Sequence, residues 1–328
     1  MVKDLYNELR IVVIGSVFST SLLLKKLYDY DYRNVLVYGH TKTVESNVDK
    51  ENLELCSRKF NFRYSSFNHI DDLLNPLRSF NPSLIFAVGL SQIIPKEILN
   101  ISKYGCIGFH PTLLPLGRGR APIAWLILNQ SELQGAATFF RLKEGVDDGA
   151  ILAQVPFEIN KEDDASSLKN KILHAEDQCL DLLLSNKNYF LQDGTEQDET
   201  KSTWYGKRIP DDGLINWSKS QSEIINLIRA SCSPYPGAFT YHKDIKIKIF
   251  KARKYEFPIR GVIGRILLLS GVNKNNFVVQ CSDGIIEVLD WESVGWSPKV
   301  GYQLGYQIEN EIYQLRKIVN KLEERIDQ

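Results

Sequence analysis

The chain has 328 residues, 43% of them hydrophobic, and its 40 basic residues balance 40 acidic ones. This length is enough for two domains with sizeable cores. A neutral chain lacks the overall positive field of a dedicated nucleic-acid binder, which disfavours a tRNA or DNA substrate. The five cysteines form no CxxC pair and no Cys/His cluster with metal-ligand spacing, so we expect no metal site and no disulfide framework.

The sequence shows no targeting or membrane segment. Residues 1–8 are mostly polar, and the apolar run that follows is short and broken by Gly15 and Ser16. Other apolar runs fall far short of the roughly 20 residues that a membrane span needs. We therefore expect a soluble, cytoplasmic protein without a membrane partner.

Short apolar runs alternate with helix-length segments in the first 90 residues. The predicted strands are 9–14, 34–38 and 83–88, with a helix at 21–29. This alternation predicts an α/β, Rossmann-like domain with a parallel sheet covered on both faces. Ligands of such sheets lie beyond the carboxyl ends of the strands, so Ser16, directly after the first strand, is a candidate substrate ligand. The segment IGSVFST lacks the GxGxxG fingerprint, so no nicotinamide cofactor is inferred.

The next hundred residues complete this domain. The predicted elements are a strand at 106–109, a Pro/Gly-rich loop at 111–122, a helix at 123–129, strands at 136–142 and 151–156 around an acidic turn at 144–149, and an amphipathic helix at 163–184 capped by Asp163 or Asp164. We place the first domain at 1–184. The polar, charged stretch 185–210 is typical of a linker.

Beyond the linker the pattern changes to short strands. After a helix at 222–230, strands are predicted at 238–241, 245–252, 261–269, 276–281 and 284–289. Turn signals at this spacing indicate a small barrel or sandwich, which we place at 211–305. Isoleucines and lysines alternate in DIKIKIF (244–250). That pattern favours a half-buried strand with a solvated lysine face over an RNA-binding surface.

Residues 306–328 are predicted to form a helix with an apolar seam. Six apolar residues recur at spacings of 4, 3, 4, 3 and 4, beginning at Ile308 and ending at Ile326. This is the a/d pattern of a coiled coil, extending for under three heptads. Two interpretations are open: a terminal helix docked on its own domain, or a helix that joins two subunits of a homodimer.

His110 and Asp147 are the residues to which the spacing assigns chemistry. His110 ends a short strand in front of the Pro/Gly-rich loop, and Asp147 lies in the acidic turn between two later strands. Residues at adjacent strand ends can meet, so the carboxylate can orient the imidazole while the imidazole carries a proton. Spacing alone supports such a pair weakly, because a histidine near a strand end is more often structural and DDG is a common turn.

The motifs around these two residues resemble a known family. The blocks FHPTLLPLGRGRAPIAWLILN and EGVDDGAILAQ are similar to the signature of the folate-dependent formyltransferases, and most similar to those that formylate nucleotide-linked amino sugars. The matching residues are His110, Thr112, Leu113, Leu114, Pro115, Arg118, Gly119, Pro122, Gly145, Val146, Asp147 and Gly149. The resemblance extends through 207–217 and 227–238, and it implies a Rossmann-like formyltransferase domain followed by a smaller OB-like β-barrel domain.

The resemblance also implies a site. The family's catalytic trio is Asn, His and Asp, of which this chain keeps His110 and Asp147, while Gly108 stands at the asparagine position. The implied formyl donor is 10-formyltetrahydrofolate, with no metal. Its implied pocket is formed by Ser91, Gln92, Ile93, Ile94, Thr138, Phe140, Leu142, Glu144 and Asp147. Loss of one oxyanion-stabilising donor typically costs about 10²–10³ in rate, so the absent amide leaves open a slow enzyme, a substitute donor or a rearranged oxyanion site.

The acceptor is predicted from the residues near this site. Arg118 and Arg120 can bind a diphosphate bidentately, although a structural ion pair is an equal alternative for Arg118. Thr112 either contacts the acceptor or caps the turn that follows it. We expect a UDP- or dTDP-linked amino sugar of cell-surface glycan synthesis as the acceptor. Methionyl-tRNA formylation is the enzymatic alternative, and a weakly catalytic binding protein is the other.

Overall fold

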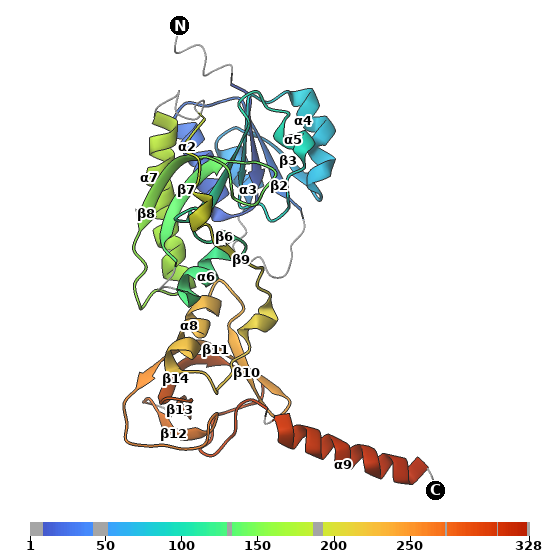
Figure 1. Cartoon of the computed structure of the whole chain (residues 1–328), viewed down its shortest axis with the longest axis vertical. Coiled ribbons are helices and arrows are strands. Elements are labelled where there is room, and N and C mark those ends of the chain that lie inside the picture. Colours follow the sequence, from blue (N-terminus) through green and yellow to red (C-terminus); the bar gives the residue numbers. More distant parts are fainter. Residues whose placement is uncertain are drawn as a thin grey trace. The chain divides into compact units, whose positions relative to one another are not determined.

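Figure 1 shows the computed structural model of the chain, which describes residues 9–41, 52–129, 133–185, 193–272, 274–306 and 308–326. The chain divides into two compact units, Met1–Ile209 and Pro210–Gln328. The polar N-terminus, part of the predicted linker (186–192) and residues 307, 327 and 328 of the predicted tail lie outside the described residues.

A seven-stranded sheet forms the core of the first unit. Its strand order is β3-β2-β1-β4-β5-β7-β8, and the first five of these strands run parallel, whereas β7 and β8 are antiparallel to their neighbours. The strands are β1 (Ile11–Gly15), β2 (Val35–His40), β3 (Arg63–Phe67), β4 (Leu84–Val88), β5 (Cys106–Thr112), β7 (Gly135–Arg141) and β8 (Ile151–Phe157). The predicted Rossmann-like architecture is confirmed, with a mixed rather than wholly parallel sheet.

Helices cover both faces of this sheet (Figure 1). One face packs against α2 (Phe18–Asp29), α3 (Leu53–Lys59) and α7 (Ala165–Ser185). The other face packs against η1 (Ile70–Leu73), α4 (Leu74–Phe80) and α5 (Lys96–Leu99). The central strands β1 and β4 are buried along their whole length, which explains their continuous apolar runs.

The sequence prediction missed strand β3 in this sheet. Its sequence RYSSF has only one buried residue, Phe67, because β3 is the edge strand. An edge strand has a neighbouring strand on one edge only, so its side chains are less covered and its apolar pattern is weak. The cap of α7 is as expected: the Asp164 carboxylate accepts a hydrogen bond from the Ser167 N–H at 2.8 Å.

Residues 193–209, which the sequence assigns to a linker, pack on the first unit. The two-residue strand β9 (Trp204–Tyr205) pairs in parallel with β6 (Arg118–Gly119), which precedes α6 (Pro122–Leu128). Thr195 bridges to Ile151 on β8. The segment Thr195–Tyr205, called the strap below, contains η3 (Glu199–Lys201), and its Thr203 accepts hydrogen bonds from the Gly117 and Arg118 N–H groups of the loop after β5.

The second unit is an antiparallel β domain. Its five strands follow the order β10-β11-β14-β13-β12. The elements are η4 (Pro210–Gly213), α8 (Gln221–Ser231), β10 (Ala238–His242), β11 (Ile245–Tyr255), β12 (Ile266–Ser270), β13 (Asn276–Gln280), β14 (Ile285–Glu292) and α9 (Ile308–Ile326). The predicted strand 261–269 begins five residues later, because Gly264 has a positive φ of 77° and turns the chain before β12.

The terminal helix α9 has no buried residue. The first of the two interpretations, a helix docked on its own domain, therefore does not describe this structure. Within the described part of the chain, none of the helices has the length and apolar character needed to span a membrane.

Glu176 on α7 gives a pH-dependent prediction. Its side chain is completely buried, and neither oxygen has a well-formed hydrogen bond. Burial outweighs the nearby Ser19 hydroxyl and raises the pKa from 4.5 to about 8. The folded state thus binds this proton more tightly than the unfolded state, so stability falls as the pH rises between these two values.

We expect Glu176→Gln to remove that loss. Urea unfolding at a pH near 8 should show a gain of about 1–3 kcal/mol over the parent, with a smaller difference near pH 5. Glu162→Gln, at an exposed position, is the matched control and should leave the unfolding free energy unchanged at both pH values. An equal effect of Glu176→Gln at both pH values would contradict this account.

Candidate functional site

Strand β5 presents its even-numbered residues on one face of the sheet. Cys106, Gly108 and His110 alternate with residues of the other face, as the two-residue period of a strand requires, and the register with β7 shifts between His110 and Thr112. His110 is 5% exposed and lies opposite Thr138 of β7. The histidine is therefore buried within the sheet, between β5 and β7.

Asp147 approaches His110 from the turn between β7 and β8. Its Oδ2 lies 3.6 Å from His110 Nδ1 and accepts a 2.8 Å hydrogen bond from the Gly119 N–H. Asp147 has a positive φ of 52°, which is uncommon for a residue other than glycine. The two residues that the sequence singled out are thus brought together.

A backbone carbonyl fixes the tautomer of His110. Its Nε2 lies 2.8 Å from the Gly117 oxygen. A carbonyl oxygen only accepts, so Nε2 carries a proton and the neutral imidazole has its lone pair on Nδ1, facing Asp147. The separation of 3.6 Å exceeds hydrogen-bond length, and the carboxylate can stabilise an imidazolium once Nδ1 takes a proton.

Apolar side chains occupy the space beside Gly108. A Cβ added there would lie 2.7 Å from Leu142 Cδ2 and 3.0 Å from Phe140 Cζ. Phe140 is opposite Gly108 in the β5–β7 ladder and is 1% exposed. The position where the family has an asparagine is therefore closed by packing on the same face as His110.

This packing predicts the effect of Gly108→Asn. The new side chain would overfill a closed space, which typically costs about 1–3 kcal/mol. We expect a lower unfolding free energy in urea and no gain in formyl transfer. Combining Gly108→Asn with Leu142→Ala should restore most of the stability, and failure of this relief would refute the packing account.

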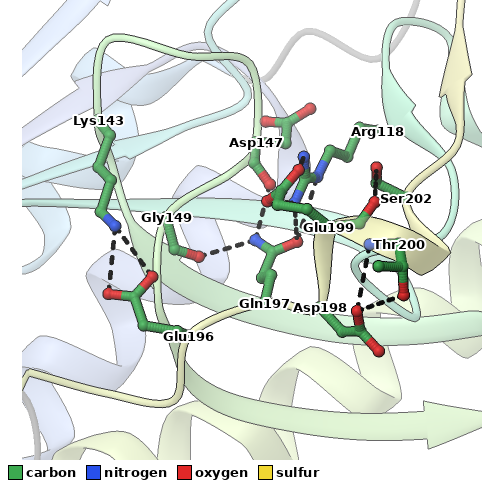
Figure 2. Close-up of polar contacts among 10 residues, drawn as sticks. All are labelled: Arg118, Lys143, Asp147, Gly149, Glu196, Gln197, Asp198, Glu199, Thr200 and Ser202. Atoms are coloured by element: carbon green, nitrogen blue, oxygen red, sulfur yellow. Dashed lines mark hydrogen bonds and ion pairs between the residues drawn. The ribbon is translucent and has the colours of Figure 1, made fainter.

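The strap residue Glu199 and its neighbour Gln197 pair with Arg118. Figure 2 shows the Arg118 guanidinium directed at both side chains. It donates to Glu199 at 2.7 and 2.9 Å and to Gln197 Oε1 at 2.8 and 3.2 Å. Arg118 is 1% exposed. Of the two alternatives for Arg118, the structure thus has the structural pair.

Gln197 also binds the acidic turn. Its Nε2 donates to the Asp147 carbonyl at 2.8 Å and to the Gly149 carbonyl at 2.7 Å (Figure 2). One amide therefore connects Arg118 to the backbone that carries Asp147. Gln197 is not predictable from the sequence, because it lies in a polar stretch where only the aromatic pair Trp204–Tyr205 indicates packing.

A cavity of about 530 Å³ opens where β5 begins and β7 ends. Leu99, Cys106 and Leu142 form apolar parts of its wall, and Glu144 and Asp148 also line it. The Asp148 Oδ1 atom is buried without a hydrogen-bond partner among the described residues. Since Cys106, Gly108 and His110 share one face of β5, the cavity lies on the face that carries the histidine.

Some of the remaining predicted site residues line this cavity and others do not. Among the predicted pocket residues, Leu142 and Glu144 line it, whereas Ser91, Gln92, Ile93, Ile94, Thr138 and Phe140 do not. Gln92 instead binds the backbone at Asn68 and Ile70. Ser16 lies at the end of β1, two strands away from β5.

Thr112 and Arg120 differ in whether their side chains have a partner within the chain. Thr112 is fully buried, and its hydroxyl donates to the Leu116 carbonyl at 2.7 Å, which is the turn-capping alternative. The Arg120 side chain is exposed and has no partner among the described residues. Of the two arginines in the GRGRAP loop, Arg120 is the one free to bind an anion.

Comparison with known proteins decides the family. Residues 9–184 match the formyl transferase family, and residues 208–295 match the formyl transferase C-terminal domain. The chain belongs to the formyl transferase family. The predicted folate-dependent formyl transferase is thereby confirmed at the level of the family. Methionyl-tRNA formyltransferase of Thermodesulfovibrio yellowstonii is 34% identical over 221 residues, which cover 67% of this chain and 68% of that protein.

Two solved structures share the fold. An N-formyltransferase from Helicobacter canadensis, in complex with folinic acid and dTDP-3-aminofucose, aligns with a TM-score of 0.66 at 17% identity, over 87% of this chain and all of that one. HypX from Aquifex aeolicus, with tetrahydrofolic acid, aligns with a TM-score of 0.60 at 19% identity, over 87% of this chain. This chain spans 44% of the HypX chain. At these identities the likeness shows the fold.

Proposed function

We propose that this formyl transferase moves a formyl group from 10-formyltetrahydrofolate to the amine of a nucleotide-linked amino sugar. The observation that carries the transfer chemistry is the buried His110, with its Nδ1 3.6 Å from the Asp147 carboxylate. The observation that favours the acceptor is the free, exposed guanidinium of Arg120, one residue after the Gly119 N–H that binds Asp147. A cytoplasmic location is part of the same proposal.

The chain's own residues supply proton transfer. Gly117 keeps the proton on His110 Nε2, so Nδ1 is the atom that accepts the proton leaving the attacking amine. Asp147 stabilises the imidazolium that results, and His110 then gives this proton to the folate nitrogen as its bond to the formyl carbon breaks. Asp147 itself is held through its carboxylate by Gly119 and through its backbone by Gln197. No amide side chain stands at position 108, so polar stabilisation of the oxyanion has to come from other groups.

The donor supplies the formyl group when it is bound. The cavity suits the pterin ring of this donor. A flat heterocycle fits the apolar wall formed by Leu99 and Leu142, and its N–H groups match the unpaired Asp148 Oδ1. The volume of about 530 Å³ lies in the usual range for such a ligand. Glu144, paired with Lys96 at 2.6 Å, lines the cavity.

The surface around Arg120 suits a nucleoside diphosphate. Lys207 is also exposed and without a partner among the described residues. It lies two residues after Tyr205, whose backbone oxygen accepts a hydrogen bond from the Arg120 N–H. Tyr205 lies 5.2 Å from the Trp125 ring. Two cations suit a diphosphate, and aromatic rings suit a base.

The sequence likeness to a methionyl-tRNA formyltransferase favours the second candidate function. Against it, the basic strand β11 is partly neutralised by acids of β14. Lys248 pairs with Glu292 at 2.6 Å, and Arg253 pairs with the buried Glu287 at 2.6 Å. Paired cations release fewer counterions from RNA than free ones, so we place the amino sugar first.

One assay separates the candidates. The purified chain is incubated with 10-formyltetrahydrofolate and, in parallel, with a panel of UDP- and dTDP-linked amino sugars and with charged initiator tRNA. Turnover with a nucleotide sugar supports the proposal, and Arg120→Ala should then raise the acceptor KM more than it lowers kcat. Turnover with the tRNA alone would refute the sugar acceptor, and donor binding without turnover in any mixture would refute catalysis.

A further inference from the structure

The terminal helix α9 carries an apolar seam that no part of the described chain covers. The six seam residues are 46–81% exposed: Ile308, Ile312, Leu315, Val319, Leu322 and Ile326. No residue of α9 is buried. An apolar stripe of this kind on a helix is normally covered by another element, so the seam calls for a partner outside the described chain.

We propose that α9 pairs with α9 of a second copy of this chain as a parallel two-stranded coiled coil. The spacings place Ile312, Val319 and Ile326 at a positions and Ile308, Leu315 and Leu322 at d positions. All three a residues are β-branched, and two of the three d residues are leucine. That combination favours two parallel strands over higher oligomers.

The charges beside the seam select the same orientation. In a parallel pair, each g residue faces the e residue five positions further along the partner helix. Glu311 at g then faces the partner's Arg316 at e, and the two-fold symmetry repeats this attraction. An antiparallel pair would set Glu311 against the partner's Arg325, which is also attractive. It would add two repulsive contacts, Glu309 against the partner's Glu323 and the two copies of Arg316 against each other, so the parallel pair has the better balance of charge.

The length of the seam sets the strength of the dimer. Nineteen helical residues span about 28 Å, which is shorter than the three to four heptads of a sustained coiled coil. We therefore expect a reversible dimer with a dissociation constant on the order of micromolar. The candidate active site lies in Met1–Ile209, a different unit from α9, so activity per chain should not depend on dimer formation.

Sedimentation of the full chain across concentrations tests the pairing. The parent should shift from monomer to dimer between about 0.1 and 50 µM. The double variant Leu315→Asp/Leu322→Asp should remain a monomer throughout. The matched control Gln314→Asp/Asn320→Asp adds the same charge away from the seam and should dimerise like the parent. A monomeric parent, or an undiminished dimer in the seam variant, would overturn the proposal.

A charge-exchange cycle tests the orientation. Glu311→Arg and Arg316→Glu, each alone, place like charges across a parallel dimer and should weaken it about fivefold. The two substitutions together should restore the parent affinity. In an antiparallel dimer these two residues do not face each other, so persistent weakness of the combined variant would overturn the parallel arrangement.

Discussion

Replacing His110 with asparagine is expected to lower kcat/KM for formyl transfer about 10³-fold, because positioned proton transfer contributes about 10²–10⁴ in rate. The asparagine amide lies about where His110 Nδ1 lies, so it falls short of the Gly117 carbonyl that His110 Nε2 reaches at 2.8 Å. It has no basic nitrogen to place beside Asp147. Steady-state assays with the acceptor identified from the panel measure the loss.

The control for this variant separates chemistry from folding. Donor binding to His110→Asn, measured by calorimetry, should stay within about threefold of the parent, because His110 does not line the cavity proposed for the pterin. Asp147→Asn should lower kcat less than His110→Asn, since it removes the charge that stabilises the imidazolium and not the base itself. A His110→Asn enzyme with more than a tenth of the parent activity would contradict the assigned role.

The central fold follows from local sequence patterns, and its periphery does not. The strands β1 and β4 are continuous apolar runs because both of their faces are buried. The edge strand β3 has no such signal. The strap is recognised only in three dimensions, because its two-residue strand β9 is too short for any periodicity and its main contacts lie about 80 residues away in sequence.

The site shows the same division. Motif order pointed to His110 and Asp147, and the structure places them 3.6 Å apart. The sequence leaves open whether Arg118 binds a ligand or an acidic side chain, because the residue type alone does not distinguish these two roles. Only the fold shows the buried guanidinium bound to Gln197 and Glu199. The closing of the space beside Gly108 by Leu142 and Phe140 likewise depends on the pairing of β5 with β7.

Arg118→Met is the second variant for which we expect a large effect. Arg118 is the largest of the fully buried side chains in the described chain, and its removal leaves Gln197 Oε1 without its donor. Loss of a partner from a buried polar pair costs about 3–5 kcal/mol. Since the Glu199 side chain is 61% exposed and regains water, we expect a loss of about 2–3 kcal/mol in urea unfolding.

The same substitution should also reduce catalysis, because Gln197 connects Arg118 to the Asp147 backbone. A displacement of about 1 Å at a catalytic group can reduce the rate about 10²-fold. We therefore expect kcat of Arg118→Met to fall about 10- to 100-fold under conditions where the variant is folded, with the donor KM little changed.

Gln197→Leu should reproduce the loss of kcat with a smaller loss of stability. Lys201→Ala, which removes an exposed cation of the strap, is the control. A Gln197→Leu enzyme with parent kcat and an unaltered pH profile would show that the strap stabilises the fold without positioning Asp147.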